Sequence, residues 1–238
     1  MPKKEIPVMS GKNKLKKFAD LSTFSNVFQN HDIRQPELIN SNEEIVEMKG
    51  RWNKDYFKND HPLVLELACG KGEYTVGMAQ QNPAINYMGV DIKGNRIWKG
   101  ATDALDLKLD NVAFLRTRIE QIELFVAPNE VDEIWITFAD PFLKKGKANR
   151  RLTSPPFLDR YRKILKPGGL VHLKTDEKRL SDFTLEVIES DPATNLLYYK
   201  EDIYSEPLDF SELEIKTYYE KMHLVKGKTI KYLRFTIS

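Results

Sequence analysis

Short apolar runs alternate along the chain with stretches in which apolar residues recur at helical spacing. Between residues 63 and 190 this alternation repeats five times. Strands that alternate with helices of this length are typical of βαβ units and of a parallel sheet. We therefore predict an α/β fold, with a short helix after the third strand. The predicted strands are residues 63–68, 86–92, 111–116, 131–139 and 168–176, and the longer helices end near residues 81, 109, 165 and 190.

The C-terminal region has a different pattern. Two strand-like runs, residues 195–202 and 229–238, are joined by a long loop for which the pattern predicts no helix. Two successive strands without a helix to carry the chain across the sheet are expected to be antiparallel. Together with the five parallel strands, they predict a mostly parallel seven-stranded sheet with an antiparallel edge.

The N-terminal region fits neither pattern. Residues 1 to about 20 are basic and lack periodicity, which is typical of a flexible arm. Four apolar residues recur at roughly helical spacing between residues 42 and 58, and this predicts a helix. We therefore divide the chain into a basic N-terminal arm with a helical extension, residues 1–59, and a main domain, residues 60–238.

Charge is unevenly distributed along a nearly neutral chain. The 37 Lys and Arg against 35 Asp and Glu leave a net charge of only +2. Three segments are nevertheless cationic: residues 2–17 hold six lysines and one glutamate, residues 144–151 five cations and no acid, and residues 216–234 six cations and one glutamate. These clusters predict either one cationic face or three separate solvated loops, and the charge pattern favours neither.

Composition limits the class of protein. A single cysteine, Cys69, excludes an internal disulfide framework and is typical of a reducing compartment. No segment approaches the roughly 20 apolar residues that a membrane span needs, and the N-terminal lysines lack the apolar run of a signal peptide. The histidines show no metal-ligand spacing. We expect a cytoplasmic protein with no membrane partner and no metal, either a monomer or a homodimer.

Polar residues and glycines follow several of the predicted strands. In open parallel sheets, ligands bind outside the carboxyl ends of the strands. Glycines there let the backbone approach a ligand closely, and an aspartate about 20 residues further on is placed to bind ribose hydroxyls. The candidate ligand-binding residues at these ends are Glu66, Gly70, Gly72, Asp91, Asp140 and Asp176.

The glycine turn departs from the dinucleotide fingerprint. In "GKGEYT", Thr75 falls where the third glycine would lie. Glu66 is near the place of the pyrophosphate, where a carboxylate would repel a diphosphate. A cationic cofactor without phosphate fits better, and S-adenosylmethionine carries a sulfonium and an ammonium group. The residues favour a methyltransferase over a dehydrogenase, against the alternative that they are ordinary turn residues.

Four segments resemble the tRNA (guanine-N7-)-methyltransferases: "LELACGKGEYTVGMA", "YMGVDIKGNRI", "ITFADPFLKKGKANRR" and "TYYEKMHLVKGKTIKYLRF". The resemblance runs from about residue 63 to the C-terminus, and its D-P-x-x-K and T-x-x-E elements are the most specific. It implies a Rossmann-like class I S-adenosylmethionine-dependent methyltransferase. The expected reaction is methylation of N7 of guanosine 46 in the variable loop of tRNA.

The resemblance also implies roles for individual residues. The cofactor-binding residues would be Glu66, Gly70, Gly72, Asp91 and Asp140. The substrate-binding residues would be Lys144, Asp176, Thr217, Tyr218, Tyr219 and Glu220. Asp140 and Asp176 are the candidate catalytic carboxylates, with Glu220 as a third. The other cations of the basic loop are expected to contact the RNA backbone: Lys145, Lys147, Arg150 and Arg151.

Some positions depart from the family pattern. Phe142 replaces the tryptophan of the P-D-P-W element, Lys147 replaces a usual histidine, and Tyr218 stands where a lysine is common. Arg118 occupies an acid or amide position and cannot accept a hydrogen bond from adenine, so the backbone or Glu120 would have to do so. Two alternatives remain: a methyltransferase for a small molecule or protein, and an inactive RNA-binding scaffold.

Overall fold

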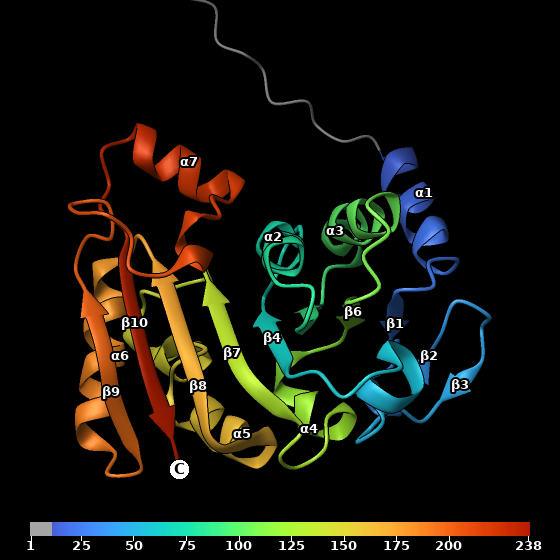
Figure 1. The fold of residues 1–238 in the computed structure, drawn as a ribbon, viewed down its shortest axis with the longest axis horizontal. Coiled ribbons are helices and arrows are strands. Elements are labelled where there is room, and N and C mark those ends of the chain that lie inside the picture. Colours follow the sequence, from blue (N-terminus) through green and yellow to red (C-terminus); the bar gives the residue numbers. More distant parts are fainter. Residues whose placement is uncertain (1–10) are drawn as a thin grey trace, which may run out of the picture.

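Ten strands form one continuous sheet in the computed structural model, which describes residues 11–238 (Figure 1). The strands are β1 Val27–Gln29, β2 Leu38–Ile39, β3 Ile45–Val46, β4 Leu63–Leu67, β5 Asn86–Asp91, β6 Val112–Arg116, β7 Val131–Thr137, β8 Leu165–Thr175, β9 Thr194–Lys200 and β10 Lys231–Ile237. They lie side by side in the order β3-β2-β1-β6-β5-β4-β7-β8-β10-β9.

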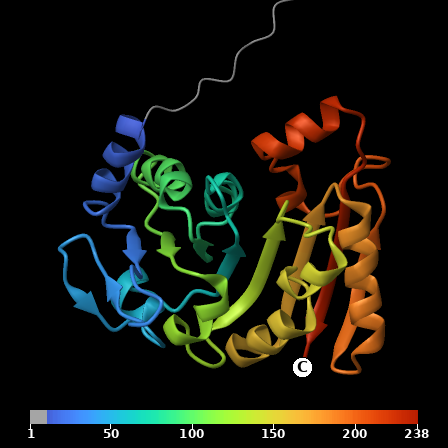
Figure 2. The same cartoon turned by 180° about the vertical axis from the view of Figure 1, so that it is seen from behind.

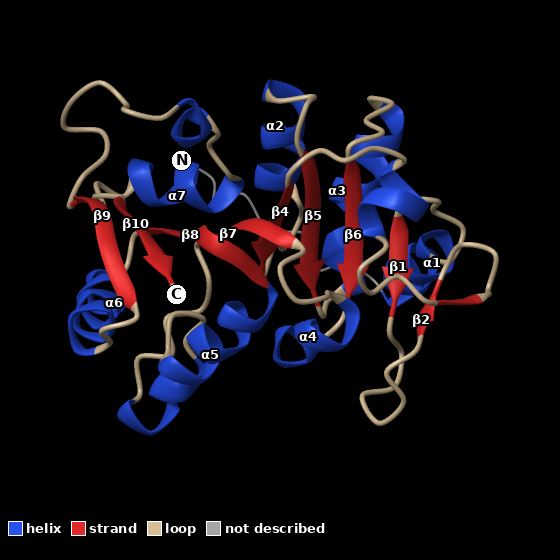
Figure 3. Ribbon diagram, turned by 60° about the horizontal axis from the view of Figure 1, so that its bottom comes forward, coloured by secondary structure: helices blue, strands red, loops and turns tan. Residues whose placement is uncertain are grey.

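Helices cover both faces of this sheet. The α-helices are α1 Gly11–Leu21, α2 Glu73–Gln81, α3 Gly94–Asp106, α4 Ile122–Phe125, α5 Pro155–Ile164, α6 Lys178–Ser190 and α7 Tyr218–Val225. Short 3-10 helices are η2 Ile119–Gln121, η3 Lys145–Arg150 and η4 Ser211–Glu214, and η1 Trp52–Phe57 is a π-helix. Figure 3 shows α4, α5 and α6 on one side of the sheet and α2 and α7 on the other.

The pairing confirms the predicted mostly parallel sheet with an antiparallel edge. Strands β6, β5, β4, β7 and β8 are parallel neighbours, whereas β10 is antiparallel to both β8 and β9. The chain runs from β4 outward to β5 and β6 and then returns to β7 on the other side of β4. This reversal creates a switch point at the carboxyl ends of β4 and β7, where α/β sheets bind ligands.

Two hydrophobic clusters, one on each face, hold the sheet. One contains buried residues of α4, α5 and α6, and the other contains residues of α1, α2 and α3. The alternation of the strands explains the division: Val171 and Leu173 belong to the first cluster, whereas the ring of His172 stacks on Trp135 of the second.

The N-terminal extension is less helical than predicted. Residues 42–58 contain β3 and only the π-helix Trp52–Phe57, so the prediction of a helix over the whole stretch was wrong. Met48, Trp52 and Phe57 pack individually into the cluster that holds α4, α5 and α6, whereas Ile45 is exposed. Trp52 is fully buried, and its Nε1 donates to Phe125 O at 2.9 Å. Strand β1 pairs in parallel with β6, which adds β1, β2 and β3 to the seven predicted strands.

The basic arm is only partly described. Residues 1–10 of the predicted flexible arm lie outside the described residues, but Gly11–Leu21 forms helix α1, which that prediction did not include. Phe18 and Leu21 lie so close to Gly94 that a Cβ there would be 2.9 Å from each. Helix α1 is therefore packed against the start of α3.

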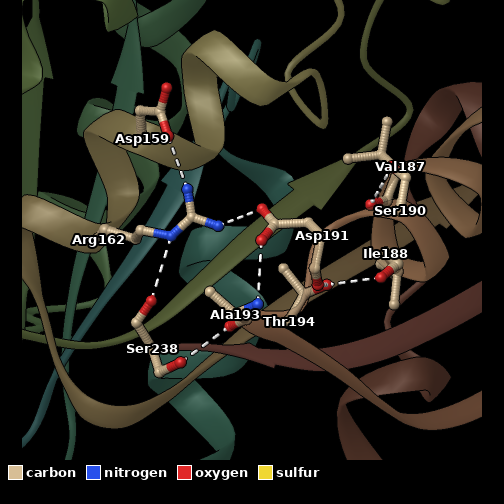
Figure 4. Close-up of polar contacts among 9 residues, drawn as sticks. All are labelled: Asp159, Arg162, Val187, Ile188, Ser190, Asp191, Ala193, Thr194 and Ser238. Carbon is tan, nitrogen blue, oxygen red and sulfur yellow. Dashed lines mark hydrogen bonds and ion pairs between the residues drawn. The ribbon is translucent and has the colours of Figure 1, made fainter.

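The C-terminal edge is tied down at the amino end of β8. Arg162 of α5 donates to the carboxylate of Asp159 at 2.6 Å and to Ser238 O at 3.2 Å, and it pairs with Asp191 (Figure 4). Asp191 also accepts a hydrogen bond from Ala193 N at 3.0 Å. These contacts join α5, the turn after α6 and the chain end. Figure 2 shows the whole molecule from behind.

Candidate active site

A cleft of about 390 Å³ lies at the switch point of the sheet. It is bounded by Ala68 after β4, Asp91 at the end of β5, Thr117 and Arg118 after β6, and Asp140 after β7. Four neighbouring strands thus contribute their carboxyl ends to one cavity. Its volume is within the range of small-molecule sites, roughly 300 to 1,000 Å³.

One wall of the cleft is apolar and its rim is charged. Ile92, Ile119, Leu152 and Phe157 form the apolar part. Both signs of charge line the same cavity, with carboxylates at Asp91, Glu120 and Asp140 and guanidinium groups at Arg118 and Arg150. An apolar wall suits a purine ring. The mixed charges suit a ligand that carries both signs, as S-adenosylmethionine does with its sulfonium, ammonium and carboxylate groups.

The glycine turn between β4 and α2 has a backbone conformation that residues with a Cβ adopt only with strain. Gly70 and Gly72 have φ of +57° and +69°. A Cβ on Gly72 would lie 2.7 Å from the ring of Phe114. The turn is tied to Asp91, whose Oδ2 accepts from Gly70 N at 3.0 Å and whose Oδ1 accepts from Lys93 N at 2.8 Å. Each oxygen retains a lone pair for a ribose hydroxyl.

Glu66 lies beneath this turn and not in the cleft. It is 2% exposed. Its Oε2 accepts from both N–H and hydroxyl of Thr75, the N–H at 2.9 Å, and its Oε1 accepts from Thr137 Oγ1 at 2.6 Å. Burial raises the pKa of Glu66 to about 7, although these hydrogen bonds act to lower it. Glu66, the predicted cofactor carboxylate, therefore joins the first turn of α2 to the end of β7, and Thr75, in place of a third glycine, is one of its donors.

Asp140 stands in a strained turn on the rim of the cleft. Its Oδ1 accepts from Phe142 N at 2.9 Å, and the carboxylate is exposed. Phe138 and Phe142, on either side, have φ of +50° and +41°, a region that non-glycine residues rarely adopt. Such strain clusters at functional sites and persists only when neighbouring contacts impose it.

Arg151 supplies one of those contacts. Its Nε donates to Pro141 O at 3.0 Å and its Nη2 to Phe142 O at 3.3 Å, while its guanidinium lies 4.3 Å from the ring centroid of Phe183. Arg151 is 9% exposed. The prediction grouped it with the RNA-binding cations, but the structure uses its hydrogen bonds to hold the turn that carries Asp140.

The remaining cations of this loop are exposed. They are Lys144, Lys145, Lys147 and Arg150, and Arg150 also lines the cleft. Helices α1 and α7 stand at the same end of the sheet, toward which the arrows of β4, β7 and β8 point (Figure 1). The described parts of all three basic segments thus reach one end of the molecule. Lys231 differs, since it is part of β10 and buried.

Ion pairs join Asp176, the predicted substrate residue after β8, to α7 and the turn that follows it. Asp176 pairs with Lys228, and its Oδ2 lies 3.2 Å from Nδ1 of His223 on α7. The His223 ring stacks on Phe138, with centroids 6.1 Å apart. Burial lowers the pKa of His223, with Asp176 opposing. A connecting helix was not predicted here, so α7 corrects the expectation of a helix-free loop.

The T-x-x-E element begins α7 as an N-cap. Thr217 Oγ1 accepts from Glu220 N at 3.2 Å. Tyr218 and Tyr219 are 47% and 42% exposed, and the Lys71 ammonium lies 4.6 Å from the ring centroid of Tyr218. Glu220 is fully buried against Lys174, at 2.9 Å, so the structure separates it from the exposed tyrosines.

Sequence reasoning missed the residues that support this site. They are Thr137, Arg151 in its structural role, Lys174 and His223. A lysine at an inward-facing position of an apolar strand was the only signal for Lys174, since buried lysines are rare unless paired. The others carry no local signal, because their partners are distant in sequence.

The described residues contain neither a metal-binding cluster nor a membrane-spanning helix. Among residues 11–238, no three His, Cys, Asp or Glu side chains are grouped as they would be around a metal ion. In the same part of the chain, no helix is both long and apolar enough to cross a membrane.

Comparisons with known proteins agree with this geometry. A family model described as "Putative methyltransferase" matches residues 60–233. A tRNA (guanine-N(7)-)-methyltransferase of Christiangramia forsetii is 47% identical over 97% of this chain and 100% of its own length. The enzyme of the same name from Bacteroides thetaiotaomicron is 48% identical over 95% of this chain and 86% of its own.

Solved structures are similar in fold at lower identity. The 16S rRNA methyltransferase KamB has a TM-score of 0.61 and 15% identity, covering 82% of this chain and 97% of that one. A SAM-dependent methyltransferase from Aquifex aeolicus has a TM-score of 0.52 and 15% identity, covering 81% and 92%. At this identity the likeness concerns the fold alone.

Proposed function

This chain belongs to the tRNA (guanine-N(7)-)-methyltransferase family, and on that premise we propose that it methylates N7 of guanosine 46 in the variable loop of tRNA. When bound, S-adenosylmethionine supplies the methyl group on its sulfonium. The observation that carries the proposal is a single cleft in which Asp91, tied to the glycine turn, and Asp140 face the same space.

The reaction does not require the protein to transfer a proton. Guanine N7 has a lone pair and no proton, so no general base is needed. The protein must align N7 with the methyl group, which is a proximity effect, and it must stabilise the positive charge that develops on the purine. The exposed carboxylate of Asp140 is held in one orientation by Phe142 N, at 2.9 Å, and is suited to that electrostatic role.

The cofactor half of the cleft has a place for each part of the nucleoside. Asp91 would bind the ribose hydroxyls, and Ile92, Ile119, Leu152 and Phe157 would contact the adenine ring. Glu120 lines the cavity beside Arg118 and is the acceptor available for the adenine amino group. The departure at Arg118 is therefore compatible with cofactor binding.

Exposed cations and aromatic rings surround the opening. Lys144, Lys145, Lys147 and Arg150 would contact phosphates, which give affinity without reading sequence. In an RNA helix N7 lies in a deep, narrow groove, so the target base has to be exposed or turned out. The exposure of Tyr218 and Tyr219 favours stacking on a base over a core role for these rings.

The remaining assignments follow from this function. Residues 60–238 would be the catalytic domain, and residues 1–59 an extension whose basic arm adds charge toward the RNA. An enzyme that modifies tRNA acts where tRNA is, in the cytoplasm. The chain would act as a monomer or a homodimer.

Methyl transfer tests the function directly. Labelled S-adenosylmethionine is incubated with an unmodified tRNA transcript and with a transcript carrying adenosine at position 46, and the product nucleosides are separated. We expect 7-methylguanosine from the first transcript only. Equal transfer to both would refute the position. No transfer, with cofactor bound in calorimetry, would favour a small-molecule or protein substrate, and absence of cofactor binding would favour an inactive scaffold.

A further inference from the structure

Lys174 occupies an unusual position for a lysine. It lies on β8 two residues before Asp176 and is fully buried, on the sheet face opposite to Val171. Its carbonyl accepts from Phe138 N at 2.9 Å, close to the turn that carries Asp140. Lys174 is therefore linked by backbone to both segments that carry the candidate carboxylates Asp140 and Asp176.

The ammonium group of Lys174 points to one part of the chain. Residues 201–228, here called the substrate segment, join β9 to β10 and carry η4 and α7. Lys174 Nζ donates to Leu213 O and Ile215 O, each at 3.1 Å, and pairs with Glu220 Oε1 at 2.9 Å. Tyr204 OH donates to the same oxygen at 2.6 Å. The three donors of the ammonium thus match three acceptors of the substrate segment.

Other residues also hold this segment, and Asp176 contacts both His223 and Lys228 near its end. Tyr74 OH donates to Glu212 O at 2.7 Å, and Glu73 Oε2 accepts from Tyr218 N at 3.1 Å. Lys174 differs because it joins the carbonyls of Leu213 in η4 and Ile215 just after it to the side chain of Glu220 on α7. It therefore links η4 to the first turn of α7, which carries the exposed Tyr218 and Tyr219.

A contribution to stability does not by itself explain why Lys174 and Glu220 form a buried ion pair. Burial lowers the pKa of Lys174, while Glu220 opposes that shift. Replacing a buried ion pair by apolar residues of similar volume is often neutral or stabilising, because desolvation of both charges is costly. An apolar pair would fill the same space, but it would not direct two carbonyls and one carboxylate to a single point.

From these contacts we propose that Lys174 is a positioning residue, which holds the substrate segment over the cleft so that α7 meets the target base. This inference rests on the proposed function for the identity of the substrate, but the anchoring itself does not. Nothing in the comparisons assigns a role to Lys174, and it touches neither the cleft nor an exposed surface.

The test compares Lys174→Met with Val171→Ala. Methionine keeps the bulk of the lysine stem, and Val171→Ala weakens the opposite face of the same strand. For Lys174→Met we expect hydrogen exchange of the α7 amides to rise about tenfold or more, with exchange in β4, β5 and β7 unchanged. The affinity for S-adenosylhomocysteine should stay within about twofold, while kcat/KM for tRNA falls by roughly 10- to 100-fold. Val171→Ala should show no selective effect on α7.

Several outcomes would overturn the proposal. Unchanged exchange in α7, or equal losses of cofactor affinity and tRNA methylation, would show that Lys174 is only part of the core. If Lys174→Met does not fold, Glu220→Gln keeps both carbonyl contacts and Tyr204→Phe keeps the packing. If neither of these two variants shows a selective rise in hydrogen exchange of the α7 amides, the proposal is also refuted. If the wild-type protein does not methylate tRNA, the proposed function fails, whereas the exchange measurements still decide the anchoring.

Discussion

Two buried glutamates support the two halves of the site in different ways. Glu66 lies under the glycine turn of the cofactor half and is held by hydroxyl and backbone donors without a cation. Glu220 lies under the substrate half and is paired with Lys174 at 2.9 Å. One acid is therefore stabilised by neutral donors and the other by an opposite charge.

The difference has a chemical consequence. Without a cation, burial raises the pKa of Glu66 to about 7, so this support changes its charge near neutral pH. The substrate half is joined by ion pairs that act across the fold, at Lys174 and again at Asp176 with Lys228. The cofactor half relies partly on contacts close in sequence, such as Glu66 with Thr75, and the substrate half on ion pairs between distant residues.

The largest effect on methyl transfer should come from replacing Asp140, the carboxylate between the cofactor half and the substrate half of the site. Asp140→Asn keeps an oxygen to accept from Phe142 N but removes the negative charge. We expect kcat for tRNA methylation to fall by about 10² to 10³-fold, as for other preorganised electrostatic groups. Single-turnover transfer measures this, and cofactor affinity is the control. Sustained activity would remove Asp140 from the mechanism.

The pH dependence of stability would test the support of the cofactor half. The folded pKa of Glu66, about 7, is above the ordinary 4.5. Below pH 4.5 the group is protonated in both states. As pH rises from 4.5 through 7 the unfolded chain ionises first, so folded stability falls, in total by on the order of 3 kcal/mol. Glu66→Gln should remove this part of the dependence. Parallel stability curves for the two proteins in urea from pH 5 to 8 would contradict it.

The glycine turn can be tested by adding one methyl group. Gly72→Ala forces a Cβ to 2.7 Å from the Phe114 ring at φ +69°. We expect a loss of about 1 to 3 kcal/mol in the free energy of unfolding, and weaker cofactor binding. Gly146→Ala is the matched control, since a Cβ there has no neighbour within 4 Å. Equal stability of both variants in denaturant titrations would show that the turn is not constrained.

The smallest effect should come from a single exposed cation of the basic loop. Lys144→Ala should weaken tRNA binding by less than about 1 kcal/mol and reduce the slope of log K against log salt by roughly 0.7 to 0.9. Cofactor affinity should not change. Lys166→Ala, on the amino end of β8, is the control and should leave the slope unchanged. An identical slope for Lys144→Ala and wild type in filter binding would remove Lys144 from the RNA contact.

Much of the fold was predictable because its signals are local. Alternating strands and helices predicted the parallel sheet, and a pair of strands without a crossover helix predicted the antiparallel edge. Asp91 and Asp140 were expected near one another because carboxyl ends of parallel strands meet at one edge, and both line the cleft. A helix over residues 42–58 was wrong because apolar spacing cannot distinguish a helical face from residues that pack one by one.

What the tertiary structure alone decided is how charged and polar side chains are used. The sequence shows Arg150 and Arg151 as neighbouring cations, but one lies on the cleft and the other holds Pro141 O and Phe142 O. The sequence shows Glu66 and Glu220 as acids near the predicted site, but both side chains are buried and bind other residues of the protein. The role of a polar side chain depends on its burial and on the donors and acceptors that replace water around it. Those partners meet only after the sheet has brought its strand ends together.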